Sequence, residues 1–536
     1  MKRRDFLRAT TALAGAAELY PIKVLASRYL TSEGKFGVHP FITSNPAAVF
    51  IMKTGVDIKT NAEAKIKAGM DFSRSIFVPM SSEDGGVPLT HTVVIKPNLT
   101  WAQMTNSKAT VEGCRGIVTD PEVVEGIVEA LKELGISAGQ IYTRDKWNYN
   151  GTTNQQEFIG YKQLSERTGI DIGGSEQGAT ANTLGEGQVN WVDITDGVFF
   201  TKAPYLWPIN SPDSFLINIA KLKTHGMGVT TCAKNLQGSM ATPYVSHCKH
   251  HGVDMGLSSD HVVPGAFDTI SECYNRHLAD GIPRWDKPSS GLNMETWCHR
   301  CIDNNSVTKP ALHVVEGVYG RNGNFVNGPG SDGLAQDFMT NVIIFGKNPF
   351  HVDNIAHWIA GHEPGNFGIF HIAIERGLSR LLNPMDIPIY EWKADGSATL
   401  TPLTNFERTP LLSPYLCRNY NGQSESTYHM VNEPFDYPAP TRINYQEVPK
   451  SFVLKQNYPN PFNPNTSIEY VLPKAGYASI EIYNINGQLV DVLLDGYQSA
   501  GIHMVIWNTN NHATGIYFYR FRSSDFSQTR KMTLLK

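Results

Sequence analysis

The stretch from residue 217 to residue 240, INIAKLKTHGMGVTTCAKNLQGSM, joins a buried-strand pattern to a concentration of cationic side chains. Lys221, Lys223 and His225 follow the apolar residues, and two glycines come next. Glycine lets a backbone turn sharply and approach a ligand closely. Lysines neutralise carboxylate or phosphate groups, and an imidazole with a pKa of roughly 6.5 is suited to proton transfer. The segment therefore predicts an anion-binding pocket at the end of a strand.

A helix is expected to begin directly after this strand. Thr230 and Thr231 are favourable first residues, and Lys234 and Asn235 then lie about one turn into the helix, within reach of the same ligand. A helix N-terminus preceded by glycines is a natural anion site. The alternative is that these lysines are solvated and that the glycines form a structural turn.

Polar residues also follow the other strands of the predicted sheet. Ligands of open α/β sheets bind in the crevice beyond the carboxyl ends of the strands, so we expect these residues to converge there. The strand at 90–100 ends in Lys96 and Asn98, and the strand at 311–320 carries Glu316. The strand at 340–349 leads into a helix that contains Asp353.

These positions divide by expected role. The predicted catalytic residues are His225, Lys223 and Lys96. The predicted ligand-binding residues are Asn98, Lys221, Lys234, Asn235, Glu316 and Asp353.

A histidine-rich segment at 247–251 raises the question of a metal. His247 and His251 are four residues apart, with Asp254 beyond, and imidazoles with a carboxylate are ligands for a divalent metal ion. Gly252 disfavours a helix there, and a polar surface loop is the alternative.

Seven cysteines leave at least one thiol without a cysteine partner. Cys298 and Cys301 form a single C-x-x-C pair, which would make a zinc site if Cys273 and His277 joined it. Disulfides and free thiols are the alternatives.

The fold is predicted from an alternation of strands and helices. Residues 90–100 are continuously apolar and β-branched, as in a strand buried on both faces of a parallel sheet. Asp120 and Pro121 mark a helix start, Gly135 marks its end, and a further strand follows. We expect an α/β domain at 45–395, with a mostly parallel sheet flanked by helices. An extension and linker at 396–449 and a second domain at 450–536 follow.

Composition and the N-terminus limit the possible partners. The net charge of the 536 residues is −4 and no long basic run occurs, which argues against nucleic-acid binding. No apolar stretch reaches the roughly 20 residues of a transmembrane helix. Residues 1–26 carry Arg3 and Arg4 before a short run of small apolar residues, a pattern similar to a Tat signal peptide. The alternative is a chance basic start.

The C-terminal 87 residues alternate in the manner of short strands joined by turns, and predict a small all-β immunoglobulin-like sandwich. The segment 458–464 (YPNPFNP), the sequence at 482–484 (IYN), Trp507 and the sequence at 515–517 (GIY) resemble the sorting domain of the type IX secretion system. The resemblance implies passage through the periplasm, recognition of 450–536 by the type IX machinery, and a secreted or cell-surface location.

The α/β segment resembles the family named domain of unknown function 362. The matching motifs are Lys96-Pro97-Asn98, the KLKTH sequence at 221–225, Lys234-Asn235 with Gly238, and Asp353. Glu316 stands where the resemblance leads us to expect an aspartate. Some relatives carry cysteine clusters for iron–sulfur centres, and this chain has no C-x-x-C-x-x-C run, so we expect no iron–sulfur cluster.

Three functions are compatible with this pattern. The first is a secreted or surface enzyme acting on a small anionic molecule, isomerase-like or metal-dependent. The second is a surface protein that binds an anion or a metal without turnover. The third is a structural protein in which the motif residues serve folding.

Overall fold

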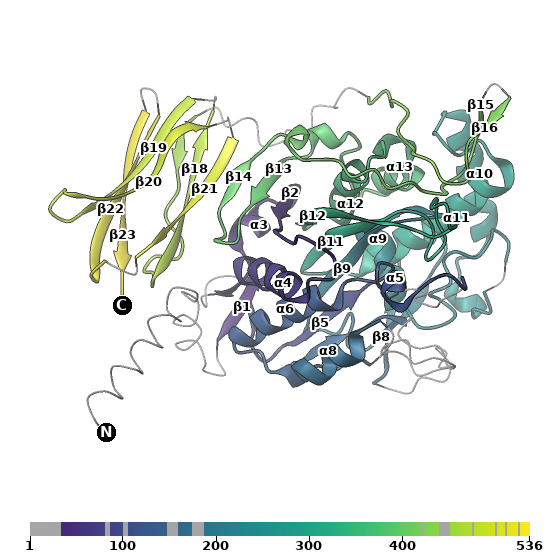
Figure 1. Cartoon of the computed structure of the whole chain (residues 1–536), viewed down its shortest axis with the longest axis horizontal. Helices are drawn as coiled ribbons and strands as arrows, with labels where there is room; N and C mark the ends of the chain where they lie inside the picture. Colours follow the sequence, from purple (N-terminus) through teal and green to yellow (C-terminus); the bar gives the residue numbers. More distant parts are fainter. Residues whose placement is uncertain are drawn as a thin grey trace.

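The computed structural model of the chain describes residues 34–80, 86–99, 106–146, 159–173, 187–253, 255–420, 422–438, 451–473, 476–498, 501–509, 512–523 and 526–536. The predicted signal peptide at 1–26 lies outside these residues. Figure 1 shows a large α/β unit beside a smaller all-β unit.

The α/β unit is built on one mixed sheet with the strand order β6-β5-β9-β11-β12-β2-β13-β14. The strands β6, β5, β9 and β11 run parallel to one another, whereas β12 is antiparallel to both of its neighbours. Their bounds are β2 Val49–Lys53, β5 Thr92–Pro97, β6 Ile141–Thr143, β9 Ser214–His225, β11 Leu312–Arg321, β12 Asp337–Gly346, β13 Ile389–Trp392 and β14 Ala398–Leu400.

Each face of this sheet is covered by its own helices, because successive side chains of a strand point to opposite faces. On one face Ile217 and Ile219 of β9 share a core with α4 (Ala62–Ile76) and α6 (Pro121–Glu133). On the other face Ala220 and Leu222 pack with α12 (Pro349–Ile359). Lys221 and Lys223 lie an even number of residues from Ile217 and Ile219, so their side chains leave β9 on the same face, the one that α6 covers.

The helix α6 has the boundaries that its sequence predicts. The Asp120 carboxylate accepts hydrogen bonds from the N–H groups of Glu122 and Val123, and Pro121 occupies the first turn. Gly126 of α6 crosses Gly69 of α4 so closely that a Cβ atom at Gly126 would lie 2.0 Å from the carbonyl oxygen of Ile66. The helix α6 is thus held firmly against α4, and the N–H of its cap residue Asp120 donates to Glu316 of β11.

Other elements complete the α/β unit around the sheet. They are β1 Lys35–Val38, α3 Pro40–Ser44, β3 Phe77–Met80, β4 Val87–Pro88, α5 Val111–Arg115, α8 Tyr161–Thr168, β7 Val189–Asp193, β8 Lys202–Leu206, β10 Gly228–Thr230, α9 Cys232–Asn235, α10 Ala266–Ala279, α11 Pro288–Val307, α13 Gly368–Glu375, β15 Asn419–Tyr420 and β16 Gln423–Ser424.

The α/β core extends beyond the expected limits of 45 and 395. Phe36 of β1 is fully buried in the core under α4. After β14, Leu411 joins the core under α12, and Tyr415 and Val431 are buried with the helices α11 and α13. The expected linker therefore packs on the domain through much of its described part, and residues 439–450 lie outside the described residues.

The C-terminal unit consists of antiparallel strands in two layers. One layer is formed by β17 (Val453–Leu454), β18 (Asn465–Leu472) and β21 (Gly501–Asn508), and the other has the order β20-β19-β22-β23. The latter strands are β19 Gly476–Asn484, β20 Leu489–Gln498, β22 Gly515–Ser523 and β23 Phe526–Leu534. The buried side chains of Trp507, Tyr519 and Phe521 fill the space between the layers. This arrangement confirms the predicted β-sandwich. The bridge Ala398–Met504 joins β21 to β14.

Among the described residues, no helix combines the length and apolar character that a membrane crossing requires.

Candidate functional site

The carboxyl end of β5 carries a buried lysine that is fully paired. Lys96 Nζ lies 2.7 Å from the Asp145 carboxylate, which follows β6, and also donates to Asn235 Oδ1 at 3.1 Å. Asn98 donates to the same Asn235 oxygen at 3.1 Å. Burial lowers the pKa of Lys96, and the charge of Asp145 opposes this effect. The structure thus brings together Lys96, Asn98 and Asn235 as predicted.

Gly238 is required for this arrangement. A Cβ atom at position 238 would lie 2.9 Å from an oxygen of Asp145 and 3.0 Å from Lys96 Nζ. The backbone that follows α9 therefore touches the Lys96–Asp145 ion pair, and a side chain there would push the pair apart.

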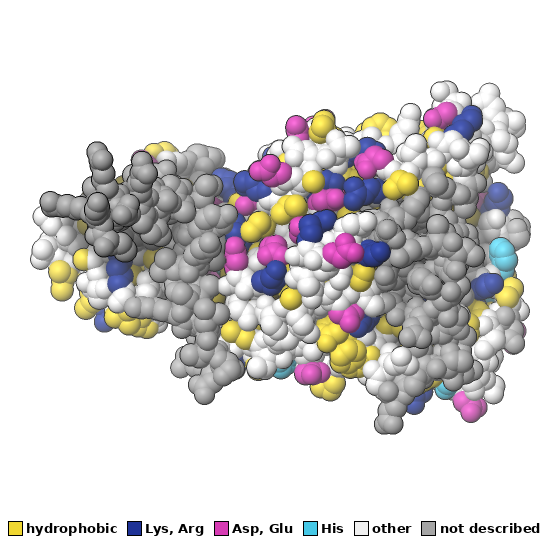
Figure 2. All heavy atoms as spheres, turned by 60° about the horizontal axis from the view of Figure 1, so that its bottom comes forward, with side chains coloured by type: hydrophobic (Ala, Val, Ile, Leu, Met, Phe, Trp, Pro, Cys, Tyr) yellow, Lys and Arg dark blue, Asp and Glu magenta, His cyan; other side chains and the backbone are white. Residues whose placement is uncertain are grey.

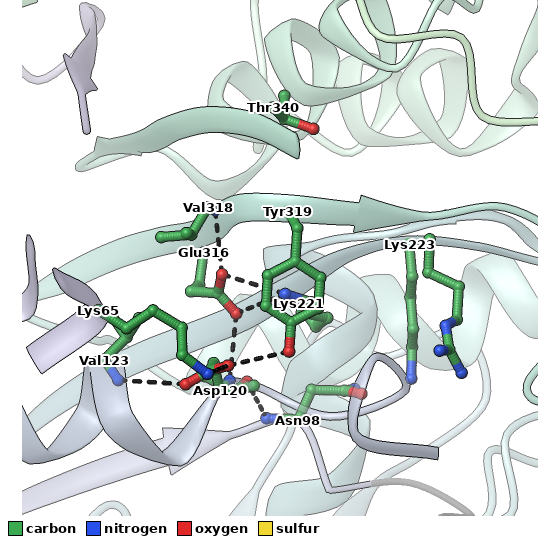
Figure 3. A network of polar contacts seen from close by, with 12 residues as sticks. Lys65, Asn98, Asp120, Val123, Lys221, Lys223, Glu316, Val318, Tyr319 and Thr340 are labelled. Atoms are coloured by element: carbon green, nitrogen blue, oxygen red, sulfur yellow. Dashed lines mark hydrogen bonds and ion pairs between the residues drawn. The ribbon is translucent and has the colours of Figure 1, made fainter. Parts of the chain in front are cut away.

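Lys221 belongs to a second, separate buried cluster, which Figure 3 shows beneath β11. Its Nζ lies 2.8 Å from Glu316 Oε2 and stands over the ring of Tyr319. The Tyr319 hydroxyl donates to Asp120 at 2.9 Å, and Lys65 of α4 contacts the same carboxylate at 2.7 Å. All five side chains are buried.

The charges in this cluster compensate one another. Burial alone would raise the pKa of Asp120, but Lys65, Glu122 and Lys221 together outweigh burial and bring the pKa to about 2. Burial and Asp120 raise the pKa of Glu316, against the effect of Lys221. Both acceptor oxygens of Glu316 are used, by Lys221 and by the N–H groups of Asp120 and Val318. Lys221 and Glu316 therefore form a closed ion pair, with the character of a structural support.

Lys223 and Lys234 differ from the other buried lysines. Lys223 is 1% exposed, and within the described part of the chain its amine donates only to the carbonyl oxygen of Ile117. Lys234 is 9% exposed, and among the described residues neither amine has a carboxylate within ion-pair distance. Burial first, then Lys234 and Arg321, hold the pKa of Lys223 well below its usual value. Two uncompensated amines therefore lie close together beyond the end of β9.

His225 lies beside these amines at the last position of β9. Burial, Lys234 and Lys223 hold its pKa well below the usual value, so the imidazole is neutral at physiological pH. Its Nδ1 accepts from the N–H of Met227 at 3.2 Å, which fixes the ring at the hairpin between β9 and β10. Gly228 turns this hairpin with a φ of +96°. His225, Lys223 and Lys234 thus lie near one another, as the sequence predicts.

The Asp353 carboxylate lies at the N-terminus of α9, the position where the sequence predicted a bound anion. Its two carboxylate oxygens accept from the N–H groups of Cys232 at 2.7 Å and Ala233 at 2.8 Å, the first residues of α9. Burial raises its pKa to about 7. The anionic group at the N-terminus of α9 is therefore a side chain of α12 and not a ligand. The short helix α9 is positioned by Asp353 and in turn positions Lys234 and Asn235.

The strand before α12 runs against the expected direction. Because β12 is antiparallel to β11, its carboxyl end lies at the opposite edge of the sheet from the ends of β5 and β9. Lys347 accordingly donates to the carbonyl oxygen of Ala311, at the start of β11, at 2.6 Å. Asp353 reaches α9 because α12 lies across the sheet.

His247 and His251 do not share a helix. His247 is buried, with its Nε2 3.4 Å from the sulfur of Met240, and both ring nitrogens of His251 contact hydroxyl groups, those of Thr296 and Ser271. Asp254 lies outside the described residues. Within the described part of the chain, neither histidine belongs to a cluster of three potential metal ligands.

Cys298 and Cys301 are buried on successive turns of α11, and Cys301 donates to the carbonyl oxygen of Ala233 at 3.2 Å. All seven cysteines are free thiols.

Surface charge does not mark a binding face on the side drawn in Figure 2, where acidic and basic side chains are interspersed. Lys223 and Lys234, which have no carboxylate partner among the described residues, are buried instead.

Several partners at the site were not predicted. Asp145 pairs with Lys96, and the Tyr319 ring lies under the amine of Lys221. Lys65 pairs with Asp120, which also accepts from the Tyr319 hydroxyl. The sequence contains an indication for two of these residues. Asp145 follows a predicted strand, and Asp120 is a recognisable N-cap.

The order of these motifs along β5, α9, β11 and α12 can be compared with known families. Residues 93–357 match the family model described as domain of unknown function (DUF362). The central part of this chain is a DUF362 domain. Residues 456–534 match the secretion system C-terminal sorting domain, and the chain is therefore a secreted or cell-surface protein. No curated protein matches the chain.

The DUF362 match includes His225, Asp353 and four of the lysines, Lys96, Lys221, Lys223 and Lys234. Lys65 and the strands β2, β13 and β14 of the same sheet lie outside it. The sorting domain coincides with the β-sandwich.

Proposed function

We propose that the DUF362 domain is an enzyme that acts on a small anionic molecule bound beyond the end of β9, between Lys223, Lys234 and His225. The observation that carries the proposal is the contrast between the buried lysines. Lys65, Lys96 and Lys221 each lie within 3 Å of a carboxylate, whereas Lys223 and Lys234 have none among the described residues.

Burying an ammonium group without a counter-ion is costly, so folded proteins either pair such a group or leave it neutral. A ligand carboxylate or phosphate would provide the missing counter-charge to Lys223 and Lys234. Binding would then raise the pKa of both amines, because an opposite charge favours the charged form.

His225 supplies a proton-transfer group beside the anion. Its imidazole is neutral because burial and the two lysines lower its pKa. A neutral imidazole can accept a proton from a bound substrate, and an ammonium group beside it stabilises the negative charge that develops. Lys96, fixed by Asp145 and Asn235, holds α9 and thereby Lys234 in place. This combination supports proton abstraction next to a carboxylate or carbonyl group, as an isomerase requires.

The second candidate function is anion binding without turnover. The burial and fixed position of the Lys223 amine support it. The amine is almost fully buried and is held by the Ile117 carbonyl, an arrangement suited to retaining an anion.

A thermal-shift screen tests the proposal. Phosphate and small mono- and dicarboxylates are added to the wild-type chain, to Lys223→Met and to Lys234→Met, with Lys67→Met as a matched control. Lys67 lies on the exposed side of α4. We expect at least one anion to raise the melting temperature of the wild type and of Lys67→Met only. If both site variants respond like the wild type, the proposed site is wrong.

Turnover separates the two candidates. A hydroxy-acid or keto-acid that stabilises the protein is incubated with it in deuterated water, and deuterium incorporation is followed by NMR. Incorporation that is lost in His225→Gln supports an enzyme. Binding without incorporation supports the binding protein.

A further inference from the structure

The helices α10 and α11 lie side by side at the end of the α/β unit that is remote from the sorting domain (Figure 1). Cys273 comes from α10, and Glu295 and His299 come from α11, one turn apart. A thiol sulfur, a carboxylate oxygen and a ring nitrogen of these residues all lie within 4.8 Å of one another.

The three side chains are held in a polar site inside the protein. Glu295 is fully buried and His299 is 2% exposed, whereas Cys273 is half-buried. Glu295 Oε1 lies 3.0 Å from His299 Nε2. Its Oε2 accepts from His277 Nδ1 at 2.9 Å and from the Trp285 indole N–H. One carboxylate oxygen is thus anchored by outer donors, and the other faces His299.

We propose that Cys273, Glu295 and His299 form a zinc site. Zn²⁺ binds cysteine sulfur at about 2.3 Å and histidine nitrogen or carboxylate oxygen at about 2.0–2.2 Å, which places its ligands about 3–4 Å apart. Glu295 Oε1 and His299 Nε2 already lie 3.0 Å apart, and the donor atoms of all three residues lie within 4.8 Å of one another. The fourth coordination position falls to solvent on the half-exposed side, at Cys273.

Binding requires small changes only. The thiol proton of Cys273 and the imidazole proton shared with Glu295 leave as Zn²⁺ enters, since metal ligands must be deprotonated. His277 and Trp285 stay on Glu295 Oε2 and orient the carboxylate, the usual function of an outer shell. Glu375 holds the far side of His277, with its Oε1 2.8 Å from Nε2.

A second group of the same composition provides a comparison inside the chain. Cys417, Glu425 and His429 also lie within 4.8 Å of one another. There, however, the buried Arg284 guanidinium contacts Glu425 at 2.7 Å. The fixed cation takes the place that a metal would need, so we assign no metal to this group.

The test uses the full chain, prepared without a histidine tag and freed of metal by a chelator. Zn²⁺ is titrated by calorimetry and counted by elemental analysis in the wild type, Cys273→Ser and the matched control Cys417→Ser. We expect a single zinc ion in the wild type and in Cys417→Ser, and a loss of affinity of at least about 100-fold in Cys273→Ser. Equal affinity in all three, or a loss in Cys417→Ser only, would overturn the site.

Two measurements on the wild type do not depend on how a variant folds. Co²⁺ in place of Zn²⁺ should produce a thiolate-to-cobalt absorption band, and bound Zn²⁺ should protect Cys273 from alkylation as mapped by mass spectrometry. Zinc binding with neither effect would exclude Cys273 as a ligand. A reactive Cys273 in a chain that binds no zinc would identify an isolated thiol instead.

Discussion

Lys221 and Lys223 lie two residues apart on the same face of β9, yet only Lys221 ends on a carboxylate, that of Glu316 at 2.8 Å. Lys223 ends on a backbone carbonyl group. The same residue type thus serves two purposes on one strand. The first lysine closes an ion pair, and we propose that the second contacts the ligand.

This difference predicts that replacement by methionine destabilises the protein strongly at Lys221 and only weakly at Lys223. Lys221→Met removes the counter-ion of the buried Glu316 carboxylate. We therefore expect a loss of about 3–5 kcal/mol in the free energy of unfolding. Lys223→Met breaks no ion pair, and we expect a change below about 1.5 kcal/mol. Urea denaturation measures both. The double variant Lys221→Met/Glu316→Leu should recover much of the loss, and a Lys223→Met protein as unstable as Lys221→Met would contradict this assignment.

The close approach at Gly238 gives a second prediction. A methyl group at this position would lie about 3 Å from both members of the Lys96–Asp145 pair. We expect Gly238→Ala to cost about 1–3 kcal/mol of stability and to weaken anion binding. Gly226→Ala is the matched control, because a Cβ atom there meets nothing within 4 Å. Equal stability of the two variants would refute the steric explanation.

Anion affinity should depend on pH through Lys223 and His225. The pKa values of both are well below their usual ranges in the free protein, and a bound anion raises them. Binding therefore takes up protons, and the affinity falls as the pH rises. Calorimetry in buffers of different ionisation enthalpy measures this uptake. Lys223→Met should reduce it, Lys67→Met should not, and binding without proton uptake would argue against these two groups.

Asp353 should make stability depend on pH in the opposite sense to an ordinary aspartate. Its pKa is about 7 in the folded chain and about 3.9 when unfolded, so between these values the folded state holds the additional proton. Its contribution to stability is therefore present at low pH and is lost as the pH rises toward 7. Relative to Asp353→Asn, the wild type should lose roughly 1.4 kcal/mol per pH unit in this window. An unchanged slope would show that Asp353 is ionised throughout.

The sorting domain predicts the route of export. Removal of residues 450–536 deletes the segment that the type IX machinery recognises, and we expect the chain to accumulate in the periplasm. Cell fractionation with an antibody against the α/β domain measures this. Normal secretion of the truncated chain would contradict the assignment.

Much of this architecture could be predicted from local sequence signals. The cap at Asp120 and Pro121 defined the start of α6, and apolar runs defined β5, β9 and β11. The direction of β12 could not be predicted, because strand pairing depends on contacts between distant segments. For this reason the strand at 340–349 was expected to end at the same edge as β5 and β9, whereas Lys347 at its end lies at the opposite edge.

The site was predictable as a set of residues but not as a set of pairs. The sequence places Lys96, Lys221, Lys223 and Lys234 at one edge of the sheet, but it does not indicate which of them has a carboxylate partner. Which of them is neutralised depends on Asp145, which pairs with Lys96, and on Glu316, which pairs with Lys221. Both pairings are fixed only by the packing of strands that are distant in the sequence. Asp353 likewise acquires its partner, the N-terminus of α9, only through tertiary structure.

We propose that a bound anion provides the counter-charge of Lys223 and Lys234, beyond the end of β9. A crystal structure of the chain with the most stabilising anion from the thermal-shift screen tests it most directly. We expect the carboxylate or phosphate group to contact Lys223 Nζ and Lys234 Nζ, with His225 beside it. An anion bound elsewhere, with both amines still unpaired, would contradict the account.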